Sequence, residues 1–306
     1  MKVISPTQSR SLAESFLEGC VANETLFPSD RVSVVGVLNL TPDSFSDGGQ
    51  LFRDKGGVQT RLLAESAQRL ESEGACVLDV GGESTRPGAA TVSLADEILR
   101  VEDAISMLAE ITRLRISIDT RKAEVARRAI AAGASIINDV SGLGADPELA
   151  DVAAETGAVL ILGHMRGTPR SMQIRPGYQD VLEEVVAELE VSVDRARAVG
   201  VSTGQLVVDP GIGFGKGLQD NLELLAHAGW IRGRLGLPVL VGPSRKAFIG
   251  ELTGDPVAER DSATHAVCAV AAFAGADAVR VHDAAGARRA VTMGRALRDA
   301  RRKDRS

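Results

Sequence analysis

The feature that most constrains the fold of this chain is one repeated unit, a short apolar segment followed by a longer segment with helical spacing. The apolar segments are rich in Val, Ile and Leu, which is typical of strands buried on both faces. They predict eight strands, at 32–38, 76–80, 115–119, 135–139, 158–163, 206–209, 238–242 and 277–282. Helical spacing lies between them, at 57–73, 94–110, 121–132, 180–199, 219–234, 258–274 and 284–300.

This alternation implies parallel strands joined by helical crossovers. Eight such units in about 270 residues fit a closed (β/α)₈ TIM barrel. An open doubly wound sheet is the competing layout, but it usually carries a glycine fingerprint directly after its first strand. The residues at that place are Asn39-Leu40-Thr41-Pro42-Asp43. The sequence therefore favours an α/β fold of the barrel type.

Local helix signals and segment lengths divide the chain. Asp146 followed by Pro147 predicts the start of a helix, and Ser93 with Asp96 resembles a capping box. We expect residues 32–300 to form the barrel as one domain. Residues 1–31 are expected to be an N-terminal extension, with a short helix around 8–19, that covers the lower end of the barrel. Residues 301–306 are expected to be a basic, solvated tail.

Composition excludes several classes of protein. The 306 residues are 44% hydrophobic and 25% charged, which is enough for a large core and does not indicate disorder. The net charge of −6 argues against a nucleic-acid partner. No apolar run reaches the roughly 18 residues of a membrane span, and we expect a cytoplasmic protein without a membrane partner. Cys20, Cys76 and Cys268 have no spacing that predicts a disulfide or a zinc site.

Polar residues interrupt the apolar segments at their carboxyl ends, where barrel enzymes place their catalytic groups. They are Asn39, Asp79 with Glu83, Asp119, Asn138 with Asp139, Asp209, Ser244-Arg245-Lys246 and Arg280-Val281-His282-Asp283. Any one inward carboxylate is as readily explained by structure as by function. Seven polar strand ends at one mouth are not all explained by structure.

The types of these residues indicate a ligand. Asp119, Asn138, Asp209 and Lys246 together offer acceptors, an amide and a cation, which match the polar edge of an aminopyrimidinone ring. Arg280 and His282 are separated by one residue, so their side chains share one face of a strand and can meet an anion together.

Two polar loops, 41–49 and 83–88, contain one apolar ring each and look like lids over the mouth rather than ordinary surface turns. The segment 209–216 superficially resembles a phosphate-binding loop, but Pro210 and Gly217 occupy positions where that motif requires Gly and Ser or Thr. We interpret it as backbone packed around a ligand, with Asp209 reading the ligand and Phe214 as a wall. No metal-ligand spacing links the four histidines, which argues against a zinc hydrolase.

Eight motifs, read in order, resemble those of the dihydropteroate synthases. They are NLTPDSFSDGG (39–49), GGESTRPGA (81–89), SIDT (117–120), INDVSG (137–142), HMRGTPRSMQ (164–173), DPGIGFGK (209–216), GPSRKAFIG (242–250) and RVHD (280–283). The resemblance implies a homodimeric TIM barrel with Mg²⁺ as cofactor. The implied reaction joins 6-hydroxymethyl-7,8-dihydropterin diphosphate to p-aminobenzoate and releases 7,8-dihydropteroate and diphosphate, in folate synthesis.

The resemblance also implies a role for each matching residue. Asn39 holds the metal, and Thr85, Arg280 and His282 contact the phosphates. The residues that read the pterin are Asp119, Asn138, Asp209 and Lys246. The p-aminobenzoate site consists of Phe45, Arg86, Pro87, Phe214 and Ser244. Arg280, His282, Lys246 and Asp119 are the implied catalytic residues.

Two alternatives belong to other functional classes. A methyltransferase that passes a methyl group from a pterin to a corrinoid protein has no use for the diphosphate-binding residues Arg280 and His282, and the loop motifs also count against it. A non-catalytic pterin-binding paralogue is expected to have lost Asn39, Thr85 or Lys246, and all three are present.

Overall fold

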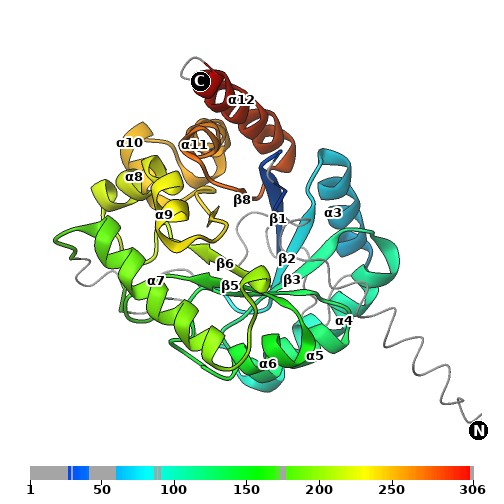
Figure 1. Cartoon of the computed structure of the whole chain (residues 1–306). Coiled ribbons are helices and arrows are strands. Elements are labelled where there is room, and N and C mark those ends of the chain that lie inside the picture. Colours follow the sequence, from blue (N-terminus) through cyan, green and yellow to red (C-terminus); the bar gives the residue numbers. More distant parts are fainter. Residues whose placement is uncertain are drawn as a thin grey trace, which may run out of the picture.

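The computed structural model describes residues 27–28, 30–40, 60–85, 88, 91–169, 171–172 and 177–303, which form one barrel (Figure 1). Its strands are β1 (Ser33–Asn39), β2 (Val77–Gly81), β3 (Arg115–Asp119), β4 (Ile136–Asp139), β5 (Val159–Gly163), β6 (Leu206–Asp209), β7 (Leu240–Val241) and β8 (Ala278–Val281). All neighbouring strands pair in parallel, in the order β6-β5-β4-β3-β2-β1-β8-β7. A bridge between Val208 and Val239 connects the two ends of that order. The predicted (β/α)₈ barrel is confirmed.

Helices surround the strands (Figure 1). They are α3 (Thr60–Glu73), α4 (Leu94–Ile111), α5 (Ala123–Ala131), α6 (Leu149–Thr156), α7 (Val181–Ala198), α8 (Leu218–Ala226), α9 (Ala228–Leu235), α10 (Ala247–Thr253), α11 (Asp261–Ala274) and α12 (Ala284–Lys303), with short 3₁₀ helices at Thr203–Gln205 and Val257–Glu259. Among the described residues, no helix has both the length and the apolar character needed to cross a membrane.

The apolar residues form two separate cores. One lies between the outer faces of the strands and the helices. The other, which we call the inner layer, fills the lower barrel and consists of Phe27, Val35, Val77, Ile136, Val159, Ile161, Val207, Leu240 and Ala278. Because both strand faces are buried, the strands read as continuous apolar runs. Phe27 lies in the part of the chain expected to cover the lower end of the barrel, and it packs into this layer.

Several boundaries differ from those expected. The segment 238–242 yields only the two-residue strand β7, since Pro238 has no N–H to donate to a ladder. The single helix expected at 219–234 is divided at His227 into α8 and α9. Helix α12 continues to Lys303 and includes the first half of the expected tail. The helix expected at 8–19 lies outside the described residues.

The two predicted helix starts have different outcomes. The Ser93 side chain accepts a hydrogen bond from the Asp96 N–H at the start of α4, as predicted. Helix α6 begins at Leu149, two residues later than the predicted start at Pro147, although Asp146 Oδ1 still accepts a bond of 3.2 Å from the Glu148 N–H ahead of the helix. The other carboxylate oxygen, Asp146 Oδ2, accepts a bond of 2.7 Å from the N–H of Ala123, the first residue of α5. It therefore satisfies a donor of the preceding helix, which sequence spacing does not reveal.

Candidate functional site

A layer of polar side chains lies directly above the inner layer, toward the carboxyl ends of the strands. Side chains alternate along a strand, so the residue two positions after an inner-layer residue also points into the barrel. This rule gives Asp79, Asn138, Asp209 and Arg280 from β2, β4, β6 and β8. The register places Asp119 of β3 beside Asn138. We call these five residues the polar mouth.

The polar mouth is joined by hydrogen bonds centred on Asp79, which is fully buried. Arg280 Nε donates to Asp79 Oδ2 over 2.5 Å, and Arg280 Nη2 donates to Asp119 Oδ2 over 2.7 Å. Asn138 Nδ2 donates to Asp79 Oδ2 over 3.2 Å. One guanidinium thus links two carboxylates from different strands, as its forked donors allow.

Two oxygens of the polar mouth have no hydrogen-bond partner in the described structure, although both are buried: Asp119 Oδ1 and Asn138 Oδ1. The Asn138 amide nitrogen donates to Asp79, which fixes the orientation of the amide. Its oxygen is therefore left as an acceptor. Buried polar atoms are rarely left unpaired in folded proteins. These two acceptors therefore indicate a ligand with N–H groups.

Asp119 ionises with difficulty in this environment. Burial raises its pKa to about 7, an effect that Arg280 opposes and that the neighbouring Asp79 carboxylate strengthens. Close to neutral pH this carboxyl group can therefore either accept or donate a hydrogen bond to a ligand. A strongly shifted group at a barrel mouth is a common sign of a functional site.

Asp209 and Lys246 lie on the other side of the mouth. Asp209 Oδ1 accepts a bond of 2.7 Å from the Gly211 N–H, and burial raises the pKa of this carboxyl group. Lys246 Nζ donates to the carbonyl oxygen of Ile212 over 2.7 Å and lies 3.9 Å from the centre of the Phe214 ring. Burial lowers the pKa of Lys246 to about 8, although Asp209 acts in the opposite direction. Phe214 thus lies against the cation, as a wall would.

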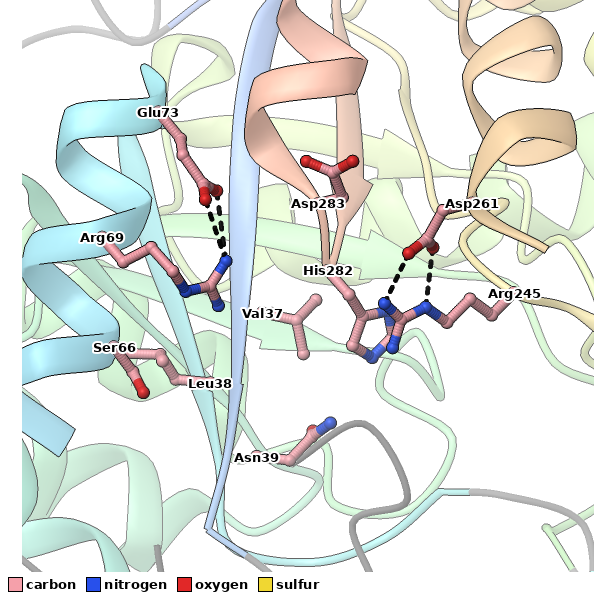
Figure 2. A pocket seen from close by; sticks show the side chains of 10 residues that line it. All are labelled: Val37, Leu38, Asn39, Ser66, Arg69, Glu73, Arg245, Asp261, His282 and Asp283. Atoms are coloured by element: carbon pink, nitrogen blue, oxygen red, sulfur yellow. Dashed lines mark hydrogen bonds and ion pairs between the residues drawn. The ribbon is translucent and has the colours of Figure 1, made fainter. Parts of the chain in front are cut away.

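His282 and Asn39 line a cavity of about 380 Å³ to which α3, β1, the residues after β8 and the start of α11 contribute (Figure 2). Ser244 Oγ and His282 Nδ1 are 2.8 Å apart, so the residue after strand β7 orients the imidazole. Arg245, also in this cavity, is paired with Asp261 through two bonds of 2.7 Å. Figure 2 shows His282 between Val37 and Arg245, with Asn39 at the carboxyl end of β1, drawn at the bottom of the view.

Asn39 is the predicted metal ligand, and its surroundings suit a hard cation. A methyl group added at Gly81 would lie 3.9 Å from Asn39 Oδ1 and 3.8 Å from Asp119 Oδ2. The absence of a side chain at Gly81 therefore leaves a space that both oxygens face. Mg²⁺ prefers oxygen donors and usually keeps waters and substrate phosphates as its other ligands. Among the described residues, no group of three or more His, Cys, Asp or Glu side chains is arranged to hold a metal ion.

The two ends of the loop after β2 are joined by hydrogen bonds of Glu83, Val92, Arg121 and Lys122, which we call the neck. Glu83 Oε1 accepts a bond of 2.9 Å from the Val92 N–H, and Glu83 Oε2 accepts one of 3.0 Å from Arg121 Nη2. Lys122 Nζ donates to the Val92 carbonyl over 2.7 Å. Thr85 lies on this loop and is half-buried. Three predicted site residues, Phe45, Arg86 and Pro87, lie outside the described residues.

Some polar strand ends do not belong to the mouth. Asp139 points away from the barrel interior and accepts bonds from the N–H groups of Ser141 and Leu143. Glu83 serves the neck described above, and Asp283 accepts a bond from the Gly286 N–H at the start of α12. These three carboxylates are hydrogen-bonded to groups outside the polar mouth, and Asp283 also lines the cavity beside His282 and Asn39.

Other residues were not predicted as site residues. Asp79 ends an apolar run as the predicted residues do. The alternation of side chains along the strand, which turns Asp79 into the barrel, could have identified it. Buried Lys216 and His164, together with the partly exposed Glu188, form a hydrogen-bonded chain next to Asp209. No local signal joins these three, because they come from three separate segments.

Comparison with known proteins gives one consistent result. The model of a family described as pterin binding enzyme matches residues 35–282. A dihydropteroate synthase of Synechocystis is 44% identical over 278 residues, which cover 90% of this chain and 94% of the relative. A dihydropteroate synthase of Escherichia coli is 42% identical over 252 residues, with coverage of 82% and 86%.

Solved structures agree with the sequence relatives. The Yersinia pestis dihydropteroate synthase, in a complex with a sulfonamide drug, superposes with a TM-score of 0.82 at 40% identity and covers 88% of this chain and 95% of its own. The Xanthomonas albilineans dihydropteroate synthase with 4-aminobenzoic acid has a TM-score of 0.79 at 42% identity, with coverage of 88% and 93%. Fold and sequence thus lead to the same set of relatives.

Proposed function

This chain belongs to the pterin-binding enzymes and is a dihydropteroate synthase, and we propose that its reaction takes place at the polar mouth of the barrel. The enzyme condenses 6-hydroxymethyl-7,8-dihydropterin diphosphate with p-aminobenzoate in folate biosynthesis, and diphosphate leaves. The assignment of individual residues to this reaction rests on their contacts and charges.

The unpaired buried acceptors of Asp119 and Asn138 carry the assignment of the pterin site. The aminopyrimidinone edge of a pterin presents N–H donors beside a carbonyl oxygen. Asp119, Asn138 and Asp209 supply acceptors for the donors, and Lys246 supplies a donor for the carbonyl. A site built from such groups favours a ligand that pairs with all of them, since any analogue lacking a partner leaves a buried group unsatisfied.

The diphosphate is assigned to the side of the mouth that carries Arg280 and His282, with Thr85 as a further contact. Arg280 stays ionised, because the Asp79 and Asp119 carboxylates hold its pKa above the usual range despite burial. Ser244 orients the His282 ring. Asn39 would hold Mg²⁺, whose charge neutralises the leaving diphosphate when the ion is bound.

The chemical step is a substitution at the exocyclic methylene carbon of the pterin. The carbon–oxygen bond to the diphosphate breaks, and its electron pair leaves with that oxygen, next to Arg280 and His282. The nitrogen of p-aminobenzoate forms the new carbon–nitrogen bond and then releases a proton. An arylamine is unprotonated at neutral pH, so the protein has to position it and does not need to deprotonate it first.

The p-aminobenzoate site is assigned to Phe214 and Ser244, next to the pterin and diphosphate sites, together with Phe45, Arg86 and Pro87. Phe214 offers a ring face beside Lys246. The neck formed by Glu83 and Val92 supports the loop that carries Arg86 and Pro87. The arylamine would thus bind between a barrel wall and two loops.

The homodimer is likewise a proposal. Val270 of α11 and Met293 and Leu297 of α12 are large apolar side chains that are 54%, 60% and 58% exposed. Their helices are neighbours on one side of the barrel (Figure 1). Exposed apolar residues on adjacent elements are typical of association surfaces. The cytoplasmic location stays a prediction.

The test of this assignment is release of diphosphate by the purified protein. We expect release only when pterin diphosphate, p-aminobenzoate and Mg²⁺ are all present, with 7,8-dihydropteroate formed in equal amount. Release that does not require p-aminobenzoate would contradict the proposed synthase reaction. A corrinoid methyltransferase or a non-catalytic paralogue would release no diphosphate under any of these conditions.

A further inference from the structure

Lys216 is a buried cation for which the proposed reaction has no role. It is 4% exposed and lies two residues before α8, at the end of the segment that begins with Asp209. Its Nζ lies 2.9 Å from His164 Nδ1, and it donates to the carbonyl oxygens of His164 and Phe214 over 3.3 and 3.1 Å. Burying an ammonium group is costly unless its donors are paired, and these three partners match its three hydrogens.

The segment 210–215 passes between two lysines. Lys246 contacts it at Ile212 and Phe214 from the mouth, and Lys216 contacts it from the side of β5. The backbone is in the left-handed region at Gly211, with φ of 72°, and a methyl group there would lie 1.9 Å from the His164 carbonyl oxygen and 3.2 Å from Lys216 Nζ. The turn therefore fits tightly against Lys216 and His164.

His164 extends the contact to the outer helices. Its Nε2 lies 2.9 Å from Glu188 Oε2 on α7, and Glu188 also accepts a bond of 2.8 Å from Arg166 Nε. If Lys216 donates to Nδ1, the imidazole is neutral and donates its Nε2 hydrogen to Glu188. Burial keeps the His164 pKa below its usual value, which agrees with a neutral ring. Lys216 then donates to His164, and His164 donates to Glu188.

The charged groups around Lys216 come from every element packed against it. They are Asp209 of β6, Lys246 before α10, Glu188 of α7 and Arg166 before α7, with the Tyr178 ring at 5.9 Å and Asp220 of α8 bonded to the neighbouring Gly217 N–H. Burial lowers the Lys216 pKa to about 7; Asp209 opposes this shift and Lys246 adds to it. Lys216 is therefore charged below neutral pH and loses its charge above it.

Asp209 depends on these cations to ionise. Burial raises its pKa, while the Gly211 N–H, Lys246, Lys216 and Arg280 lower it. Lys246 is assigned to the pterin carbonyl, so its charge is shared with the ligand. Lys216 donates its hydrogens to His164 and Phe214 and not to Asp209, so it favours the ionised carboxylate through its charge and through the turn that it holds.

We propose that Lys216, held by His164 and Glu188, is a positioning residue for pterin binding, which keeps Asp209 ionised and holds the turn 210–215 against the mouth. This inference rests on the assignment of Asp209 to the pterin. Lys216 does not touch the reacting methylene. Its loss should therefore weaken pterin binding and leave the rate of the chemical step unchanged.

The experiment compares Lys216→Met with the wild type by calorimetric titration of 6-hydroxymethylpterin at pH 6 and pH 8.5. At pH 6 the variant should bind about tenfold more weakly, as expected when the charged hydrogen bond from Lys216 to the Phe214 carbonyl of the turn is lost. At pH 8.5 the wild-type lysine is itself largely neutral, and the difference should fall below about threefold. In steady state, KM for pterin diphosphate should follow the same pattern, with kcat changed by less than about twofold. An equal loss of affinity at both pH values would overturn the proposal.

A second variant keeps the test valid if Lys216→Met does not fold. Glu188 raises the Lys216 pKa, so Glu188→Gln should move the loss of pterin affinity to lower pH. An unchanged pH profile in Glu188→Gln would also overturn the proposal. Arg234→Met is the control, because it removes a cation from an exposed pair with Glu183 and should leave the profile unchanged.

The outcomes separate this inference from the proposed function. Wild-type protein that binds the pterin but releases no diphosphate would refute the reaction, and the titrations would still test Lys216. Wild-type protein that releases diphosphate, together with a pH-independent effect of Lys216→Met, would refute the role of Lys216 alone.

Discussion

At the scale of single residues, the polar mouth places groups where they are useful for binding and unfavourable for folding. Asp119 is the clearest case, because burial raises its pKa and leaves one of its oxygens without a partner. Asp209 is buried as well, but the Gly211 N–H and two lysines offset part of the effect. Binding sites commonly carry such a cost in stability.

Replacing Asp119 with Asn should stabilise the fold in a pH-dependent way. A carboxyl group whose pKa is raised from 3.8 to about 7 contributes stability that is present below pH 4 and is lost as the pH rises through 7. The asparagine side chain does not ionise and would not bear this cost. We therefore expect the melting temperature of Asp119→Asn to exceed that of the wild type at pH 8, and the difference to shrink toward pH 4. Thermal unfolding at several pH values measures this, and a difference independent of pH would refute the cause given.

Replacing Asp209 with Asn should weaken pterin binding without unfolding the protein. The amide can still accept the Gly211 N–H, but it presents a donor to the N–H groups of the pterin. We expect affinity to fall roughly 100-fold, which corresponds to about 3 kcal/mol. Calorimetry measures the loss, and Asp194→Asn in an exposed pair with Arg197 is the matched control. Unchanged affinity would contradict the assignment of Asp209.

At the scale of elements, the crossover after β2 shows how the barrel holds the loop that we assign to p-aminobenzoate. The neck at Glu83 and Val92 ties both ends of this loop to Arg121 and Lys122, which precede α5. Although burial would raise the Glu83 pKa, the Val92 N–H and the two cations lower it below the usual value. The carboxylate is therefore charged and fully used at neutral pH.

Glu83→Gln should impair the use of p-aminobenzoate more than that of the pterin. A glutamine amide has one acceptor oxygen where the carboxylate has two, so it can keep only part of the bonding to Val92, Arg121 and Lys122. The neck should therefore loosen, while the residues assigned to the pterin stay in place. We expect KM for p-aminobenzoate to rise about tenfold and KM for pterin diphosphate to change by less than about twofold. Steady-state kinetics with each substrate varied in turn will measure both values.

The matched control is Glu124→Gln, because Glu124 lies in an exposed helical pair with Arg128. Such pairs contribute little, so this variant should behave as the wild type. Equal increases in both KM values for Glu83→Gln would show that the neck supports the whole site rather than the arylamine loop.

At the scale of the whole molecule, the small residues of α11 serve the fold itself. A methyl group at Gly294 of α12 would lie 2.0 Å from the Ala269 carbonyl oxygen, and one at Gly229 of α9 would lie 2.4 Å from the Ala274 carbonyl oxygen. The small-residue run 263–276 lets the neighbouring helices approach α11 closely. Its observed close contacts are within the chain, and the surface available to a partner is the exposed apolar one.

Leu297→Lys should therefore weaken the proposed homodimer. A charge in the middle of an apolar interface has to be desolvated on association, which disfavours the dimer. We expect light scattering at micromolar concentration to give a dimer mass for the wild type and a lower mass for the variant. Leu99→Lys on α4 is the control, since Leu99 is also 58% exposed and lies on another face. A wild-type monomer would refute the dimer, and an unaffected Leu297→Lys dimer would place the interface elsewhere.

The barrel and most of its mouth were predictable from the sequence alone, for a local reason. Apolar runs alternating with helical segments define the strands, and the polar residues that end those runs mark one end of the barrel. Asp119, Asn138 and Arg280 could be found in this way. The eight motifs that resemble the dihydropteroate synthases suggested their roles, which stay predictions, and Phe45, Arg86 and Pro87 lie outside the described residues.

Tertiary structure decided which polar groups meet. The face of a strand that points into the barrel, and the way in which the barrel closes, are not properties of the local sequence. Asn138 and Asp139 are adjacent, yet only Asn138 points inward, since the pairing of β4 with β3 and β5 fixes which face is inside. Asp79 meets Arg280 across 201 residues only because β1 pairs with both β2 and β8. His164, Glu188 and Lys216 come together through packing of the loop after β5, α7 and the segment before α8. Short-range spacing carries no information on contacts of that kind, which depend on how the closed barrel packs its helices.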